Sequence, residues 1–142
     1  MQDNIRRELA EGLANLLPTF HRKFVHKIAF PIPPNPFLTL VTLNDHGTQT
    51  LTELSKRVLM SKQQMSPIVD KLLDAGYVER TQDKTDRRSV KISITPAGFA
   101  ILAGYHEKTC DILFEDLEVL SASELKKLNH TLTDRLNLIN KL

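Results

Sequence analysis

Apolar residues recur along the first part of this chain at steps of three and four, the period of an amphipathic helix. The stripe runs from about residue 2 to residue 28 and consists of Ile5, Leu9, Leu13, Leu16, Leu17, Phe20, Phe24 and Ile28. Pro18 interrupts it. Because proline in a helix interior removes one hydrogen bond and clashes with the preceding turn, we expect a kink there or the start of a second helix. The stripe is broad for one domain's core, so we expect a partner chain to cover part of it.

Four of the chain's seven prolines lie between Pro31 and Pro36. Proline cannot donate a backbone hydrogen bond, so this segment is expected to be a stiff, extended connector that marks a boundary. From Pro36 onward the apolar residues again follow a helical pattern. Gly47 is placed to end that helix by taking the left-handed conformation.

Two capping boxes follow, after a short strand expected over residues 48–50. Thr50 precedes Glu53 by three positions, and Ser61 precedes Gln64 by three. At this spacing the hydroxyl accepts from an amide of the new helix, while the longer side chain accepts from the amide of the capping residue. Apolar residues give each helix one buried face, and Gly76 is expected to end the second helix. Two short capped helices joined by a tight turn indicate a helix-turn-helix.

Two alternating runs rich in β-branched residues come next, at residues 77–81 and 89–94. They are joined by the sequence QDKTDRR, which predicts a hairpin with a charged tip. A helix-turn-helix followed by a basic hairpin is the order of elements in a winged helix-turn-helix, a module that reads duplex DNA.

The C-terminal part of the chain predicts two further helices. Thr95 and Pro96 are expected to begin a long helix that runs to Ser121, where Ser121 and Glu124 form a third capping box. The last helix repeats apolar residues at steps of three and four up to Leu142. Such an apolar stripe must be buried against another surface. A partner chain or the chain's own first helix would provide one.

The sequences GYVER and DKTDRRSVKISITPAG, at residues 76–80 and 83–98, resemble the wing of the MarR family of bacterial and archaeal transcription regulators. The family's pattern is Asp-x-Arg followed by a strand that ends in Leu-Thr. Asp86 and Arg88 fill the Asp-x-Arg pattern, and Ile94 and Thr95 stand in place of Leu-Thr. The order of the elements agrees over almost the whole chain.

The resemblance implies a mainly α fold (α+β), a winged helix-turn-helix with a three-stranded wing sheet and long N- and C-terminal dimerisation helices. Residues 1–142 would form a single domain, with the DNA-binding lobe at 36–95 and the dimerisation helices at 1–30 and 96–142. The implied function is that of a transcriptional regulator, expected to be a repressor, which binds double-stranded DNA as a homodimer on a pseudo-palindromic operator. A small aromatic or anionic effector would modulate DNA affinity. The implied dimerisation residues are Ile5, Leu9, Leu125, Leu128, Leu132, Leu136 and Ile139.

The formal net charge of +2 is small, but the charge is unevenly distributed. Residues 76–95 hold five basic and three acidic side chains, whereas residues 105–124 hold one basic and six acidic side chains. This segregation fits a protein that meets a polyanion on one face. Two solvated helix faces would give the same counts.

Candidate DNA-binding residues lie on the second capped helix and on the hairpin. Short, amide or cationic side chains suit contact with base edges and phosphates in the major groove, and on the helix these are Ser61, Lys62, Gln63, Gln64, Ser66, Pro67 and Lys71. On the wing the candidates are Lys84, Asp86, Arg87, Arg88 and Lys91. We expect Arg88 in the minor groove, and the resemblance implies that Asp86 orients a neighbouring basic residue.

Other sites are less specifically indicated. The nearest candidates for an effector pocket are Phe20, His21, Phe24, Phe37 and His46, although core packing or surface solvation is the more common role for such residues. His106 and Cys110 lie four positions apart on an expected helix, which leaves open a redox- or metal-sensing regulator that uses Cys110. A winged helix used for protein–protein contact is a further alternative.

Several classes of protein are not expected. The sequence contains no phosphate-binding glycine loop, metalloprotease motif or nucleophile elbow, so we expect neither an enzyme nor a bound cofactor or metal. The single cysteine excludes an internal disulfide and indicates a reducing, cytoplasmic compartment. No apolar run reaches the length that spans a membrane, so no membrane partner is expected.

Overall fold

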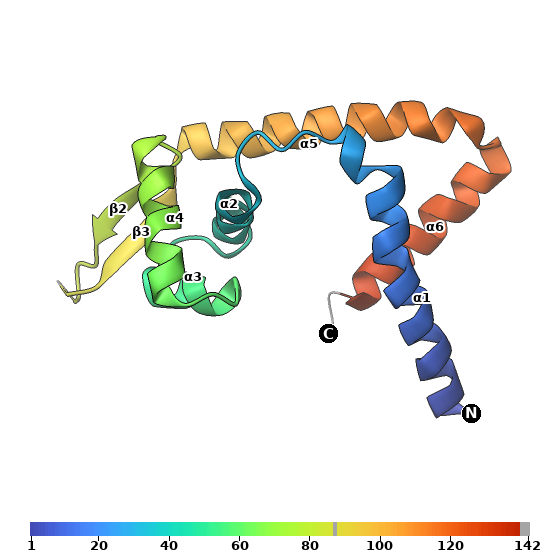
Figure 1. Ribbon diagram of the computed structural model, residues 1–142, viewed down its shortest axis with the longest axis horizontal. Coiled ribbons are helices and arrows are strands. Elements are labelled where there is room, and N and C mark those ends of the chain that lie inside the picture. The colour runs from blue at the N-terminus through green and yellow to red at the C-terminus, as the bar shows by residue number, and fades with distance from the viewer. Residues whose placement is uncertain (87, 140–142) are drawn as a thin grey trace. The chain divides into compact units, whose positions relative to one another are not determined.

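Figure 1 shows the computed structural model, which describes residues 1–86 and 88–139. The chain forms two compact units. One is Ile28–Lys108, and the other combines Met1–Lys27 with Thr109–Leu142. The expected fold class, mainly helical with a three-stranded antiparallel sheet, is confirmed.

The unit of residues 28–108 contains the helix-turn-helix and the wing. Its elements are α2 (Pro34–His46), β1 (Gln49–Thr50), α3 (Leu51–Arg57), α4 (Lys62–Asp74), β2 (Val78–Gln82), β3 (Val90–Ile94) and the first part of α5 (Pro96–Asp116). The antiparallel sheet has the order β1-β3-β2, with Ile92 of β3 opposite both Gln49 of β1 and Arg80 of β2. The short strand expected before the first capped helix is therefore part of the wing sheet.

One apolar core joins the elements of this unit. It consists of Leu40, Leu43, Leu54, Val58, Met65, Val69, Leu72, Val78 and Ile92. Full burial of a side chain of this size contributes about 1.5–3 kcal/mol relative to leaving it exposed. Met65, Val69 and Leu72 recur on one face of α4, so the core fixes that face and leaves the opposite one at the surface.

The extended connector in the proline segment is shorter than the sequence predicts. α2 begins at Pro34, so the expectation that the whole of residues 31–36 is extended is wrong for its second half. The reason is positional, because Pro34 and Pro36 occupy the first turn of the helix, where backbone amides have no partner within the helix to lose. Gly47 ends α2 with a φ of +72°, as expected.

The other unit contains α1 (Gln2–Lys23), the 3-10 helix η1 (Val25–Lys27), the rest of α5, the 3-10 helix η2 (Leu117–Val119) and α6 (Ala122–Ile139). α1 continues through Pro18, so the alternative of a second helix starting there is wrong. α5 ends at Asp116 instead of continuing to Ser121, and Lys27 of η1 forms an ion pair with Asp116. Among the described residues, no helix is both long enough and apolar enough to cross a membrane.

The third capping box forms as its spacing predicts. Ser121 Oγ accepts a hydrogen bond from the Glu124 N–H (3.4 Å), and Glu124 Oε2 accepts from the Ser121 N–H (2.8 Å). Glu124 Oε2 also accepts from the Ser121 hydroxyl (2.7 Å), and this bond, together with that from the Ser121 N–H, holds the pKa of Glu124 below its ordinary value. The start of α6 is therefore fixed locally by the sequence.

Candidate nucleic-acid interface

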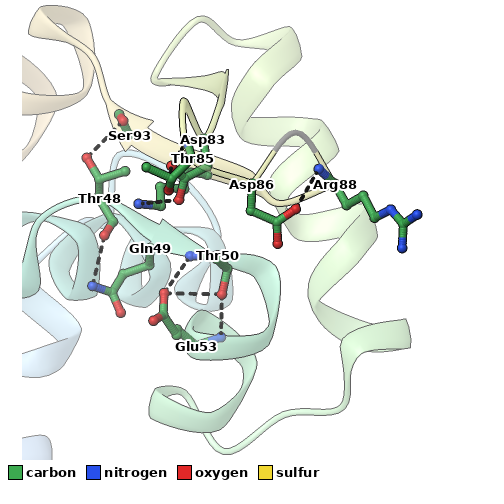
Figure 2. A network of polar contacts seen from close by, with 10 residues as sticks. Thr48, Gln49, Thr50, Glu53, Asp83, Thr85, Asp86, Arg88 and Ser93 are labelled. Atoms are coloured by element: carbon green, nitrogen blue, oxygen red, sulfur yellow. Dashed lines mark hydrogen bonds and ion pairs between the residues drawn. The ribbon is translucent and has the colours of Figure 1, made fainter.

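Both helices of the helix-turn-helix begin with the expected capping boxes. At α3, Thr50 Oγ1 accepts from the Glu53 N–H (3.2 Å) and Glu53 Oε2 accepts from the Thr50 N–H (2.8 Å; Figure 2). At α4, Ser61 Oγ accepts from the Gln64 N–H (3.2 Å) and Gln64 Oε1 accepts from the Ser61 N–H (3.0 Å). Loss of such a cap typically costs about 0.5–2 kcal/mol. The backbone and hydroxyl hydrogen bonds from Thr50 also lower the pKa of Glu53.

The turn between α3 and α4 is tight and locally strained. The Val58 N–H donates to Leu54 O and the Met60 N–H donates to Ser55 O, each at 2.9 Å. Leu59 lies between them with a φ of +56°, the left-handed region that a branched side chain adopts at a cost. Its side chain is 92% exposed, so no packing compensates for this backbone strain.

A buried glutamine ties the start of the helix-turn-helix to the preceding helix. Gln49, 8% exposed, donates from Nε2 to His46 O (3.1 Å) and to Thr48 O (3.0 Å). Its Oε1 accepts from Arg57 Nε at the end of α3 (3.0 Å). The C-terminal end of α2 and the C-terminal end of α3 are therefore connected through one side chain.

The surface of α4 that faces away from the core is polar in its first two turns. Successive helical residues rotate by about 100°, so Gln63 and Pro67 point away from the core positions. Apart from Ser66, which is half-buried, the helix candidates are exposed: Ser61, Lys62, Gln63, Gln64, Pro67 and Lys71. α4 continues through Pro67 to Asp74, and the carboxylates of Asp70 and Asp74 are exposed in its last turns.

One acidic side chain on α4 is neutralised by a residue that the sequence did not single out. Arg80 Nη2 of β2 lies 2.7 Å from Asp70 Oδ1, and both side chains are about half exposed. The pair connects the outer surface of α4 to the wing. Nothing in local spacing signals this contact, because the two residues belong to different elements.

The wing tip is held by backbone hydrogen bonds around Asp86. Asp86 Oδ1 accepts from the Arg88 backbone N–H (3.0 Å), Asp86 O accepts from the Ser89 N–H (2.9 Å), and the Asp83 N–H donates to Ser89 O (3.0 Å). Figure 2 shows the Arg88 side chain extending away from Asp86, with its guanidinium group at the far end. Asp86 therefore fixes the backbone at Arg88 and leaves the guanidinium group available. Arg87 lies outside the described residues.

A second carboxylate braces the wing. Asp83 Oδ2 lies 2.9 Å from Lys91 Nζ, and Asp83 Oδ1 accepts from the N–H (3.1 Å) and hydroxyl (2.8 Å) of Thr85. The hydrogen bond from Lys91, followed by those from Thr85, lowers the pKa of Asp83 to about 2, and Asp83 raises the pKa of Lys91. Lys91, a candidate for phosphate contact, is therefore engaged within the hairpin, whereas Lys84 is exposed.

The candidate effector residues fall into different parts of the chain. Phe20 and Phe24 pack against each other with ring centroids 5.0 Å apart, and His21 beside them is exposed. Phe37 instead packs against Phe30 (5.3 Å) and Tyr105 (4.5 Å) in the unit of residues 28–108. His46 is exposed at the end of α2.

The cysteine does not belong to a recognisable metal centre in the part of the chain that the structure describes. There, no group of three or more His, Cys, Asp or Glu side chains is arranged to hold a metal ion. His106 and Cys110 are both exposed on α5.

Comparison with known proteins places the chain among bacterial regulators. The MarR family model matches residues 32–90. The chain is 30% identical over 106 residues to the uncharacterized HTH-type transcriptional regulator YkoM of Bacillus subtilis, and the match covers 69% of each chain. It is 35% identical over 105 residues to the HTH-type transcriptional repressor NicR of Pseudomonas putida, covering 70% of this chain and 66% of NicR. The match spans 67% of the regulator YpoP and 53% of the regulator YfiV, both of Bacillus subtilis.

Solved structures agree with the fold over nearly the whole chain. A MarR family protein from Bacillus stearothermophilus aligns with a TM-score of 0.74 at 24% identity, covering 99% of each chain. A point mutant of Staphylococcus aureus MepR bound to an oligodeoxyribonucleotide aligns with a TM-score of 0.62 at 16% identity, covering 98% of each chain. Regulators of this family are not enzymes, in agreement with the expectation from the sequence. The chain belongs to the MarR family of winged helix-turn-helix transcriptional regulators.

Proposed function

We propose that this protein is a cytoplasmic, sequence-specific transcriptional repressor that binds a pseudo-palindromic operator in duplex DNA as a homodimer. We also propose that a small aromatic or anionic molecule modulates its DNA affinity. One observation carries the DNA-binding proposal: α4 starts at a fully formed cap and exposes polar residues opposite its core face, beside a wing that extends Arg88 outward. The names of two relatives, the repressor NicR and DNA-bound MepR, support it.

Base contacts are assigned to the N-terminal half of α4. Lys62, Gln63 and Gln64 offer an ammonium and amides to base edges, and Ser61, Ser66 and Pro67 complete this surface. Gln64 Oε1 serves in the cap, so its amide nitrogen is the group left for DNA. An exposed carboxylate repels phosphate, so Asp74 favours an orientation in which the first two turns enter the major groove. Lys71, in a later turn, is placed for a phosphate.

The wing is assigned to the minor groove and its phosphates. Arg88 would enter the groove, where narrow A·T-rich segments concentrate negative potential. Lys84 and Arg87 would contact phosphates, which supply most of the affinity but no sequence preference. Because Asp83 holds Lys91, we assign Lys91 first to the shape of the wing and only second to phosphate contact.

The dimer is supported by apolar surface that one protomer leaves exposed. α1 has no buried residue, and its Ile5 and Leu9 are 58% and 61% exposed. On α6, Leu125, Leu128 and Leu132 are 38–53% exposed. Apolar stripes on two helices of the same compact unit suit an interface with the same unit of a second copy. Leu136 and Ile139 continue the stripe in sequence, but their side chains lie outside the described ones.

One of the candidate effector residues, Phe37, belongs to an aromatic cluster. The aromatic cluster of Phe30, Phe37 and Tyr105 supplies ring faces within one unit, which supports Phe37 as a candidate contact. Phe20, His21, Phe24 and His46 remain the other candidates. A ligand acts on DNA binding only through different affinities for two conformations, so the expected effect is a change in operator affinity and not in dimer formation.

The test is selection of bound sequences from a random DNA pool, followed by titration of the enriched sequence at fixed salt with Arg88→Ala. We expect a palindromic consensus with half-sites about 34–36 Å apart. We expect about a tenfold or greater loss of affinity in the variant, with an unchanged dimer in analytical ultracentrifugation. Arg7→Ala, which removes an exposed arginine of α1, is the matched control and should bind normally.

Two outcomes would contradict the proposal. Wild-type affinity in Arg88→Ala would show that Arg88 does not contribute to DNA binding. Failure of the wild-type protein to enrich any sequence, together with DNA retention that does not fall with salt, would favour a winged helix that contacts another protein, because phosphate contacts release counterions.

A further inference from the structure

The first turn of α5 is tied to the turn that ends α4 by a single residue. Thr95 Oγ1 donates to Gly76 O (2.6 Å) and also accepts from the Gly98 N–H (3.2 Å). The Thr95 backbone N–H donates to Tyr77 O (3.0 Å). Capping α5 requires only the acceptor bond, so the bond to Gly76 gives the hydroxyl a second role.

The turn that receives these bonds is continuous with α4. The Gly76 N–H donates to Leu73 O and the Tyr77 N–H donates to Leu72 O, each at 2.9 Å. Gly76 has a φ of +75°, a conformation that most side chains avoid. The carbonyl groups to which Thr95 donates are therefore fixed to the last turn of α4.

The two segments also approach closely. A Cβ atom added at Gly98 would lie 2.3 Å from Tyr77 O and 2.6 Å from Ile94 Cγ1, so only glycine fits. Gly98 is buried. With both hydrogen bonds and backbone contact at the same point, the start of α5 and the end of α4 form one rigid joint.

We propose that Thr95 is a positioning residue for DNA recognition, because its hydroxyl makes the direction of α4 follow that of α5. This inference rests on the proposed function, in which α4 reads bases. α5 begins in the unit of residues 28–108 and continues into the unit that carries the apolar faces of α1 and α6.

The joint should affect base contacts more than phosphate contacts. A hydrogen bond to a base edge requires donor and acceptor within a few tenths of an ångström of their ideal distance. Phosphate attraction falls off gradually with distance and tolerates small rotations of α4. A loosened joint therefore lowers affinity for the operator while sparing affinity for unrelated DNA.

The test compares Thr95→Val, which keeps the shape but loses the hydroxyl, with Thr95→Ser, which keeps the hydroxyl. Affinity for the selected operator and for unrelated DNA of the same length is measured at fixed salt. We expect the ratio of the two affinities to fall about tenfold in Thr95→Val and to be restored in Thr95→Ser. Thr42→Val is the matched control, since the Thr42 hydroxyl donates only within α2, to Leu38 O.

A second variant distinguishes loss of the hydrogen bond to Gly76 from loss of the cap of α5. It also keeps the test valid if Thr95→Val does not fold. In Thr95→Asp the carboxylate can still accept from the Gly98 N–H but cannot donate to Gly76 O. The ratio of operator affinity to affinity for unrelated DNA should again fall about tenfold. The added negative charge weakens binding to both DNAs, so its effect cancels in this ratio.

The outcomes are distinguishable from failure of the proposed function. If the wild-type protein shows no preference for any sequence, the proposed function fails. If the wild type prefers its operator but Thr95→Val and Thr95→Asp keep the wild-type ratio, the positioning role of Thr95 is wrong and the proposed function stands. Equal losses on both DNAs would show that Thr95 only supports folding.

Discussion

Substitution by alanine should change the stability of the protein in opposite directions at two glycines of α5. Both Gly98 and Gly104 lie inside the helix, so alanine at either position lowers the loss of backbone entropy on folding by the same amount. At Gly98 the new Cβ would lie 2.3 Å from Tyr77 O, whereas a Cβ at Gly104 would have no described atom within 4 Å apart from its chain neighbours and the adjacent backbone of its own helix. The comparison therefore isolates the close approach of α5 to the α4–β2 turn.

The magnitude follows from the geometry at Gly98. Carbon–oxygen contacts normally lie at about 3.3–3.6 Å, so α5 or the turn must move by about 1 Å. Overpacking of this kind costs about 1–3 kcal/mol, and the movement weakens the Thr95 hydrogen bonds, which contribute about 1 kcal/mol each. Alanine's helix propensity offsets about 1 kcal/mol of this. We expect Gly98→Ala to destabilise by about 2 kcal/mol and Gly104→Ala to stabilise by about 1 kcal/mol.

The assay is thermal unfolding followed by circular dichroism at equal protomer concentration, because the proposed dimer would make the melting temperature depend on concentration. For a chain of this length we expect about 3–5 °C per kcal/mol. Gly98→Ala should therefore melt about 6–10 °C below the wild type, and Gly104→Ala about 3–5 °C above it. A Gly98→Ala protein as stable as the wild type would show that the joint accommodates a side chain, and the argument for its rigidity would fail.

Two further predictions concern the turn and the wing. Leu59→Gly should raise the free energy of unfolding by about 0.5–1 kcal/mol, since relief of left-handed strain exceeds the added chain entropy of glycine; an unchanged denaturation midpoint would mean that Leu59 is unstrained. The pKa of Asp83 is lowered from 3.8 to about 2, so its contribution to stability is complete above pH 3.8 and is lost as the pH falls toward 2. The difference in urea midpoint between wild type and Asp83→Asn should accordingly shrink from pH 5 to pH 2, and a constant difference would contradict the role of the Asp83 carboxylate.

Features fixed by local spacing could be predicted from the sequence. The capping boxes at Thr50, Ser61 and Ser121 each depend on residues three positions apart, and all three form. The hairpin also follows from alternation and turn chemistry, whereas the third strand of its sheet was implied only by the resemblance to the MarR family. The start of α2 could not be predicted, because proline is unfavourable inside a helix but acceptable in its first turn, and the sequence does not say where that turn begins.

Contacts between elements could not be predicted in this way. Arg80 and Asp83 look like ordinary charges of a solvated hairpin, yet one neutralises Asp70 on α4 and the other holds Lys91. Thr95 was identifiable as a helix cap, but its bond to Gly76 depends on how α5 meets the α4–β2 turn. Each of these requires the fold before the partner is known.

Ion pairing within the lobe engages two cations, Arg80 and Lys91, that would otherwise be available for DNA. Asp70 engages Arg80 and Asp83 engages Lys91, whereas in the described part of the chain no ion pair engages Lys71 or Lys84. If the three cations assigned to phosphates, Lys71, Lys84 and Arg87, each neutralise one phosphate, the salt exponent is about 3 for one lobe and about 5 for two. One lobe would then bind weakly, and operator affinity would depend on both lobes engaging together. In the proposed dimer, a ligand that altered the separation of the lobes would remove this joint binding without touching α4 or the wing, and we propose that such an effector would act through α5, which is tied to α4 at Thr95.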